Sequence, residues 1–178
     1  MKPTLPYFLF VLVLLTVSPR LHAQDNVLKA PFDWRTERLE LPLPFAPSIP
    51  ITGFEDVRFA PGWGDSTSTE FWTYAFVWVL EEEMEIDQTS LTQYLEDYYD
   101  GLMLAVAQTK DTQTEVKLTA IESGYRGVVQ TLDGFFTKER IRLSLTVQSE
   151  GNTWLFLVSP QPTSHPVWEM LEAIEVQN

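Results

Sequence analysis

The 178-residue sequence contains no cysteine and only two histidines. The lack of cysteine excludes disulfides, thiolate metal sites, a cysteine nucleophile and a lipid-anchored N-terminus, which would need a cysteine at its processing point. Beyond residue 23 the single histidine is His165. A Ser-His-Asp mechanism would need it together with Ser159 or Ser164, but neither serine lies in a G-x-S-x-G motif. A polar, proline-bound loop is the better interpretation of this segment. A zinc site with one histidine would need carboxylates for its other ligands, which is unusual.

Basic residues are also scarce. Lys2 and Arg20 precede residue 23, so the other 155 residues carry 10 of the 12 basic side chains and all 25 acidic ones, a net charge of −15. Such a surface repels both phosphate backbones and anionic lipid head groups. We therefore expect no nucleic-acid partner and no peripheral membrane binding.

One long apolar run is present, over residues 7–17. Its 11 residues have the length of a signal-peptide core, whereas a membrane-spanning helix needs about 20. Lys2 precedes the run and Ala23 offers a small residue for cleavage. The sequence predicts a signal peptide over residues 1–23, a secreted or periplasmic protein, and no membrane span after signal removal.

The remaining chain predicts an N-terminal tail over 24–33 and a single domain over 34–178. Residues 34–50 indicate an edge strand followed by an extended proline-rich segment, because proline denies donors to a sheet. Residues 71–80 form an uncharged run with strong β propensity on both faces, which is typical of a central strand covered on both sides. Alternation in 141–148 and the uncharged 154–158, joined by Gly-Asn, predict a hairpin.

Two helices are expected. Leucines and tyrosines at three-to-four spacing in "QTSLTQYLEDYYDGLMLAVAQ" predict an amphipathic helix that Asp87 or Thr89 caps, with Gly101 in close contact with the sheet. "VWEMLEAIEV" predicts a second helix that begins after Pro166. The fold class is therefore α+β, a mostly antiparallel sheet of about six strands with two helices on one face.

The chain resembles an uncharacterised family of exported bacterial proteins. The resemblance rests on "GFEDVRFAPGW", "FWTYAFVWVL" and "LFLVSPQPTSHPVWEMLEAI", above all on "RFAPG" and on "SP" followed by "PVW". It implies no activity and no catalytic residues. The element order also looks like the Mog1/PsbP-like arrangement, an antiparallel sheet flanked by helices, which implies a fold but no function.

The richest candidate for a ligand site is aromatic. Trp72 and Tyr74 begin one face of the predicted central strand, which would offer a stacking platform unless a helix covers it. Arg58 and Trp63 flank a Pro-Gly turn and would grip an anionic ligand or simply pack together. With Asp65, these four residues are the candidate ligand-binding set, and packing is the competing interpretation of each.

Carboxylates supply two further alternatives. Acid/base hydrolysis would use a pair from those beside aromatic segments, namely Glu55, Asp56, Asp65, Asp97 and Asp100. The loop "GDSTSTE" at 64–70 offers oxygen ligands to calcium but lacks the spacing of a known calcium loop. We therefore predict neither a metal site nor a cofactor.

Taken together, the residues favour an exported, non-enzymatic binding or interaction module whose partner is a small ligand or an envelope protein. The alternatives are a carboxylate-based, hydrolase-like enzyme and a structural accessory of a cell-envelope complex.

Overall fold

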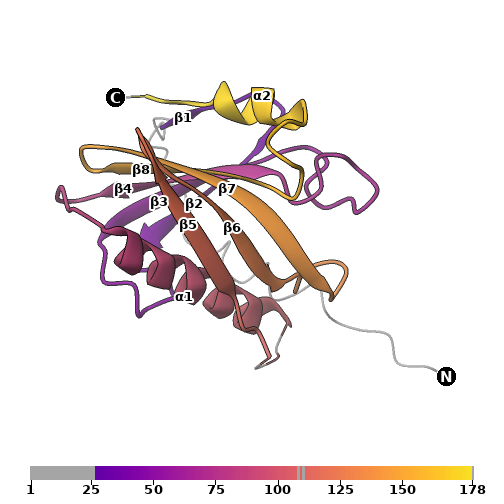
Figure 1. The fold of residues 1–178 in the computed structure, drawn as a ribbon, viewed down its shortest axis with the longest axis horizontal. Coiled ribbons are helices and arrows are strands. Elements are labelled where there is room, and N and C mark those ends of the chain that lie inside the picture. Colours follow the sequence, from indigo (N-terminus) through magenta and orange to yellow (C-terminus); the bar gives the residue numbers. More distant parts are fainter. Residues whose placement is uncertain (1–26, 108, 110, 178) are drawn as a thin grey trace, which may run out of the picture.

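The computed structural model describes residues 27–107, 109 and 111–177, so the predicted signal peptide lies outside the described part. It shows a single α+β domain, as expected (Figure 1). In chain order the elements are β1 (Leu28–Lys29), β2 (Arg35–Leu41), β3 (Gly53–Phe59), β4 (Tyr74–Leu80), α1 (Gln88–Ala107), β5 (Glu115–Ile121), β6 (Gly124–Leu132), β7 (Arg140–Glu150), β8 (Thr153–Ser159), α2 (Val167–Glu172) and β9 (Glu175–Val176).

Seven strands form one antiparallel sheet in the order β2-β3-β4-β8-β7-β6-β5. The predicted edge strand is β2, and the predicted hairpin is β7-β8, with Gly151 at a positive φ of 58° in its turn. The predicted central strand is β4, which pairs with β3 and β8 and is buried on both sides. It begins at Tyr74 rather than at residue 71, because Trp72 has φ 52° and the segment before it turns.

The two helices lie on opposite faces of the sheet, so the expectation that both cover one face is wrong. Buried side chains of α1, among them Leu95 and Tyr99, pack with Phe76 and Trp78 of β4 on what we call the α1 face. Trp168 and its neighbours in α2 pack with the alternate β4 residues on the other side, the α2 face. Figure 1 shows α1 and α2 separated by the sheet. Since β4 is apolar on both faces, each face needs its own cover.

The proline-rich segment covers part of the α1 face. Leu43, Ile49 and Ile51 from this segment are buried in the same cluster as α1. Gly101 lies against this segment and not against the sheet as expected, since a Cβ at Gly101 would lie 2.0 Å from the carbonyl oxygen of Phe45. The glycine therefore permits the close approach of α1 and the proline-rich segment.

The α2 face of the sheet is covered by segments from both ends of the domain. α2 ends at Glu172, earlier than the sequence pattern predicts, and the chain continues as β9. β9 pairs with β1, so Leu28 and Lys29 of the predicted tail are held against Val176 and Glu175. Within the part of the chain that the structure describes, no helix has the length and apolarity needed to cross a membrane.

One edge of the sheet is sealed by α1. Asp100 accepts a hydrogen bond from the N–H of Thr114 at 2.7 Å, and Glu96 accepts one from Val116 at 3.1 Å. Gln88 donates to the carbonyl oxygen of Leu118 at 3.1 Å. These side chains occupy backbone groups of β5 and of the residue before it. A further strand therefore cannot pair there without displacing α1.

Candidate functional site

The aromatic face of β4 is part of the core. Trp72 and Tyr74, two predicted ligand residues, are 1% and 4% exposed. The Tyr74 hydroxyl lies 2.5 Å from that of Tyr99 in α1, and Phe76 stacks on Phe156 of β8 with ring centroids 4.3 Å apart. The helix thus fills the position that a stacked ligand would need.

Trp63 belongs to an aromatic cluster beyond the strand ends. Its ring lies against Phe59, Phe135 and Phe136, with centroids 4.7, 5.4 and 4.9 Å away. The guanidinium of Arg35 lies over the Trp63 ring, 5.4 Å from its centroid. Contacts of this kind hold the turn to the β6–β7 connection.

Asp133 organises that connection and was missed by the sequence reasoning. Its carboxylate accepts hydrogen bonds from the backbone N–H groups of Phe135, Phe136 and Thr137, at 3.0, 3.0 and 2.8 Å. An Asp that precedes a Gly and an aromatic pair in "LDGFFTK" is a turn signal that identifies this role.

Arg58 is directed away from the aromatic cluster, toward the α2 face. Its guanidinium donates to both carboxylate oxygens of Asp56, to the carbonyl of Val57 and to that of Leu28 in β1. Arg58 and Asp56 are each 3% exposed. The pair ties β3 to the β1-β9 cover, so the structure does not bring Arg58 together with Trp63, Trp72 and Tyr74.

Asp65 lies apart from these residues as well. It is exposed, and its carboxylate accepts hydrogen bonds from the backbone N–H and hydroxyl of Thr67 at 2.9 and 2.7 Å, which lower its pKa. Glu70 accepts a hydrogen bond from the N–H of Gly62. These bonds shape a local turn. Among the described residues, no three His, Cys, Asp or Glu side chains are grouped to hold a metal ion.

The residues of the hypothetical serine mechanism hold other partners. The Ser159 hydroxyl is buried and lies 2.9 Å from that of Thr73, the residue just before β4. Nδ1 of His165 accepts a hydrogen bond from the N–H of Val167 at the start of α2, at 3.2 Å.

Glu55 is the most unusual group of the interior. It lies on the α1 face, fully buried, where its carboxyl accepts hydrogen bonds from Trp78 Nε1 at 2.8 Å and from the Tyr98 hydroxyl at 3.2 Å. Burial raises the pKa of Glu55 to about 7 although both donors lower it. Asp56 points to the other face, so these neighbouring carboxylates do not meet across a cleft.

The remaining predicted carboxylates are structural contacts of α1. Asp97 accepts hydrogen bonds from Ser48 in the proline-rich segment and from Gln93, at 2.7 and 2.8 Å. Asp100 binds the backbone of Thr114, as described above. Asp87 caps α1, since its carboxylate accepts the N–H of Ser90 at 2.7 Å.

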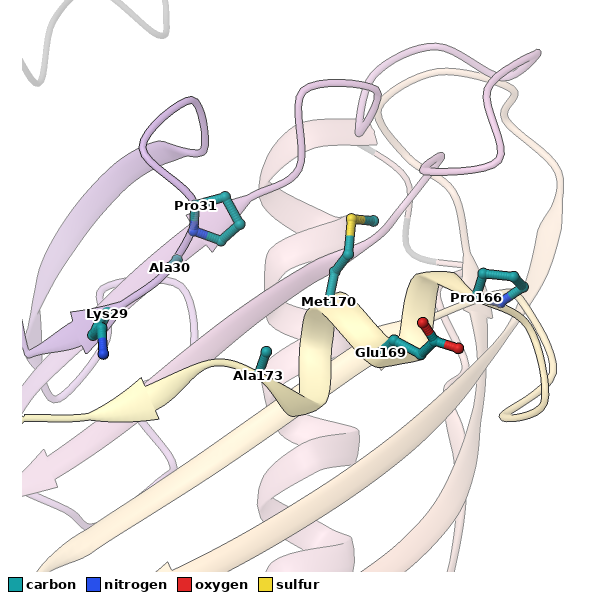
Figure 2. A pocket seen from close by; sticks show the side chains of 7 residues that line it. All are labelled: Lys29, Ala30, Pro31, Pro166, Glu169, Met170 and Ala173. Carbon is teal, nitrogen blue, oxygen red and sulfur yellow. The ribbon is translucent and has the colours of Figure 1, made fainter.

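Open grooves lie on the surface of the described residues, among them the following two. The first, of about 470 Å³, lies between α2 and the chain after β1. Figure 2 shows Pro166, Glu169 and Met170 on one side and Lys29 and Pro31 on the other. Most of its lining is apolar or aliphatic.

The second groove, of about 670 Å³, lies where β4, β5 and β7 end, and we call it the acidic groove. One wall is the β4–α1 connection with the exposed carboxylates of Glu83, Glu85 and Asp87. Tyr125 and Trp154 line it from the sheet. The hydrogen bond from the Ser90 N–H lowers the pKa of Asp87. In residues 27–107, 109 and 111–177, no cation forms a salt bridge with these three carboxylates.

No family model matches the chain, and the searches found no similar curated protein or solved structure. The resemblance to a family of exported bacterial proteins therefore stays a prediction.

Proposed function

We propose that this is an exported binding module that takes a cationic segment of a partner protein into the acidic groove. The observation that carries the proposal is the groove itself, which three exposed carboxylates and two aromatic side chains line together. Carboxylates attract ammonium or guanidinium groups, and the partly exposed Tyr125 offers a ring for cation–π contact. The net charge of −15 over residues 24–178 adds long-range attraction for a cationic partner.

The interior supports a binding function more than a hydrolytic one. Glu55, Asp56 and Arg58 are enclosed in the two cores and hydrogen-bonded to protein groups. A glycoside hydrolase that works with two carboxylates needs them on either side of its substrate. In this chain, these three buried charged residues instead hold the layers of the fold together.

The test uses a capped Lys-Lys-Lys peptide as the probe, titrated into ¹⁵N-labelled protein at about 0.15 M salt, where the screening length is about 8 Å. We expect shifts confined to residues 83–87, 121–125 and 149–154. The triple variant Glu83→Gln/Glu85→Gln/Asp87→Asn should bind about tenfold more weakly, which corresponds to about 1.4 kcal/mol. The Asn still accepts the Ser90 N–H, so α1 keeps its cap.

A charge-matched control removes three exposed carboxylates elsewhere, as Glu115→Gln/Glu139→Gln/Glu172→Gln. This control should bind nearly as well as the unmodified protein. Equal weakening in both triple variants would mean that the peptide responds to overall charge alone, and the groove would be rejected as the site.

A further inference from the structure

The two edge strands of the sheet, β5 and β2, differ in the hydrogen bonds that their outer backbone groups make. Side chains of α1 form hydrogen bonds with the backbone of Val116 and Leu118 in β5, whereas no hydrogen bond from outside β3 reaches the backbone of β2 in the described residues. The N–H of Glu81 donates to Thr52, which fixes the alternation of the β3–β4 ladder. Residues of β3 bond alternately to β4 and to β2, and the same alternation holds for β2. The N–H and C=O groups of Thr36, Arg38 and Glu40 therefore point away from the sheet.

The side chains of β2 do not guard this edge with charge of one sign. Each face of the strand carries one basic and one acidic residue two positions apart, Arg35 and Glu37 on the α1 face and Arg38 and Glu40 on the other. Edge strands avoid pairing by carrying charged side chains, proline or a bulge, or by lying under a covering element. A plus-minus pattern is instead complementary to itself when two copies run antiparallel.

We propose that two copies of this chain pair antiparallel along β2, about a two-fold axis at Leu39, and join their sheets into one. In this register Arg38 lies opposite Glu40 of the second copy on the α2 face, twice by symmetry. Leu39 lies opposite the second copy's Leu39 on the α1 face. Arg38 and Glu40 direct their backbone groups outward, so they form the hydrogen-bonded pairs of this ladder. The same register therefore satisfies both the backbone hydrogen bonds and the opposite charges.

Contacts within each copy prepare the strand for this pairing. The guanidinium of Arg38 lies over the ring of Phe54, 3.8 Å from its centroid, which holds it on the α2 face of β2. Glu40 is exposed and Leu39 is partly buried against the α1-face core. The dimer edge is separate from the acidic groove, so this inference goes beyond the proposed function and does not depend on it.

Charge reversal and charge exchange test the register. Sedimentation equilibrium of the purified protein at about 0.15 M salt should show a dimer. Arg38→Glu alone or Glu40→Lys alone should raise its dissociation constant about tenfold or more, since each creates two like-charge contacts. The double variant Arg38→Glu/Glu40→Lys should restore dimerisation, a rescue that a merely structural role of Arg38 would not produce. Circular dichroism checks that each variant is folded.

The absence of native cysteine makes a second test simple. Leu39→Cys should form a disulfide dimer on mild oxidation, because opposed residues of this pair type have Cα atoms about 4.5 Å apart. Thr119→Cys, exposed on the edge strand sealed by α1, should form no disulfide-linked dimer under the same oxidation. A protein that sediments as a monomer, or a double variant no better at dimerising than the single ones, would overturn the proposal.

Discussion

Replacing Asp56 with alanine should lower the free energy of unfolding by about 3–5 kcal/mol, because it leaves the Arg58 guanidinium in the core without the carboxylate that faces it. For a domain of this size the loss corresponds to a melting temperature lower by roughly 10 °C. The pair joins β3 to β1, so the α2 face should loosen first. Chemical denaturation followed by tryptophan fluorescence measures the change.

The double variant Asp56→Leu/Arg58→Met removes both charges. It separates the destabilisation caused by leaving Arg58 without Asp56 from the net contribution of the ion pair to stability. Apolar residues of similar volume often replace a buried ion pair at little cost, so we expect the double variant to lie close to the unmodified protein. Lys29→Met, which removes the cation of the exposed pair with Glu175, is the control and should change little. A double variant as unstable as Asp56→Ala would show that the pair itself is needed.

Glu55→Gln should remove a large pH dependence of stability. The pKa of Glu55 is raised in the folded protein from 4.5 to about 7, so the folded state holds a proton that the unfolded state releases. Its contribution is fully present below about pH 4.5 and is lost as the pH rises through 7. The difference of about 2.5 units corresponds to roughly 3 kcal/mol.

Glutamine keeps the shape of the neutral acid and an acceptor for Trp78 or Tyr98. We therefore expect Glu55→Gln to match the unmodified protein near pH 4 and to be more stable near pH 8, by up to roughly 3 kcal/mol. Glu115→Gln on β5, which is exposed, should leave the pH profile unchanged. Parallel profiles for Glu55→Gln and the unmodified protein would mean that Glu55 is ionised in the folded state.

Hydrophobic patterning was sufficient to predict the fold class and the main elements. The double-sided apolar run identified β4 as interior, and the three-to-four spacing identified α1 with its Asp87 cap. The hairpin followed from alternation and the Gly-Asn turn. These signals are local, and each depends on residues that are close in sequence.

Long-range contacts were not predictable from the same patterns. The helical spacing of 167–176 does not reveal that the chain leaves the helix at Glu172 to pair with Leu28, at the other end of the domain. An aromatic strand face in the sequence also does not show whether a helix or a ligand covers it. α1 and the proline-rich segment cover Tyr74, Phe76 and Trp78 and exclude the predicted platform.

The candidate site was misplaced for the same reason. Alternation correctly set Arg58 on the side of β3 opposite Val57, but only the β1-β9 cover makes that side a core. The acidic groove combines the β4–α1 connection with turns near residues 122 and 151. Glu83 and Tyr125 are 42 positions apart, and the sequence alone gives no reason to pair them.

The central claim is that the aromatic interior around β4 is a closed core and that binding takes place at the surface. Native-state hydrogen exchange of the β4 amides, over residues 74–80, tests it most directly. We predict that these amides exchange only through global unfolding, with the same free energy that chemical denaturation gives. Exchange through local openings several kcal/mol below that value would contradict the claim, since it would show that the layer over β4 opens in the way a ligand cavity does.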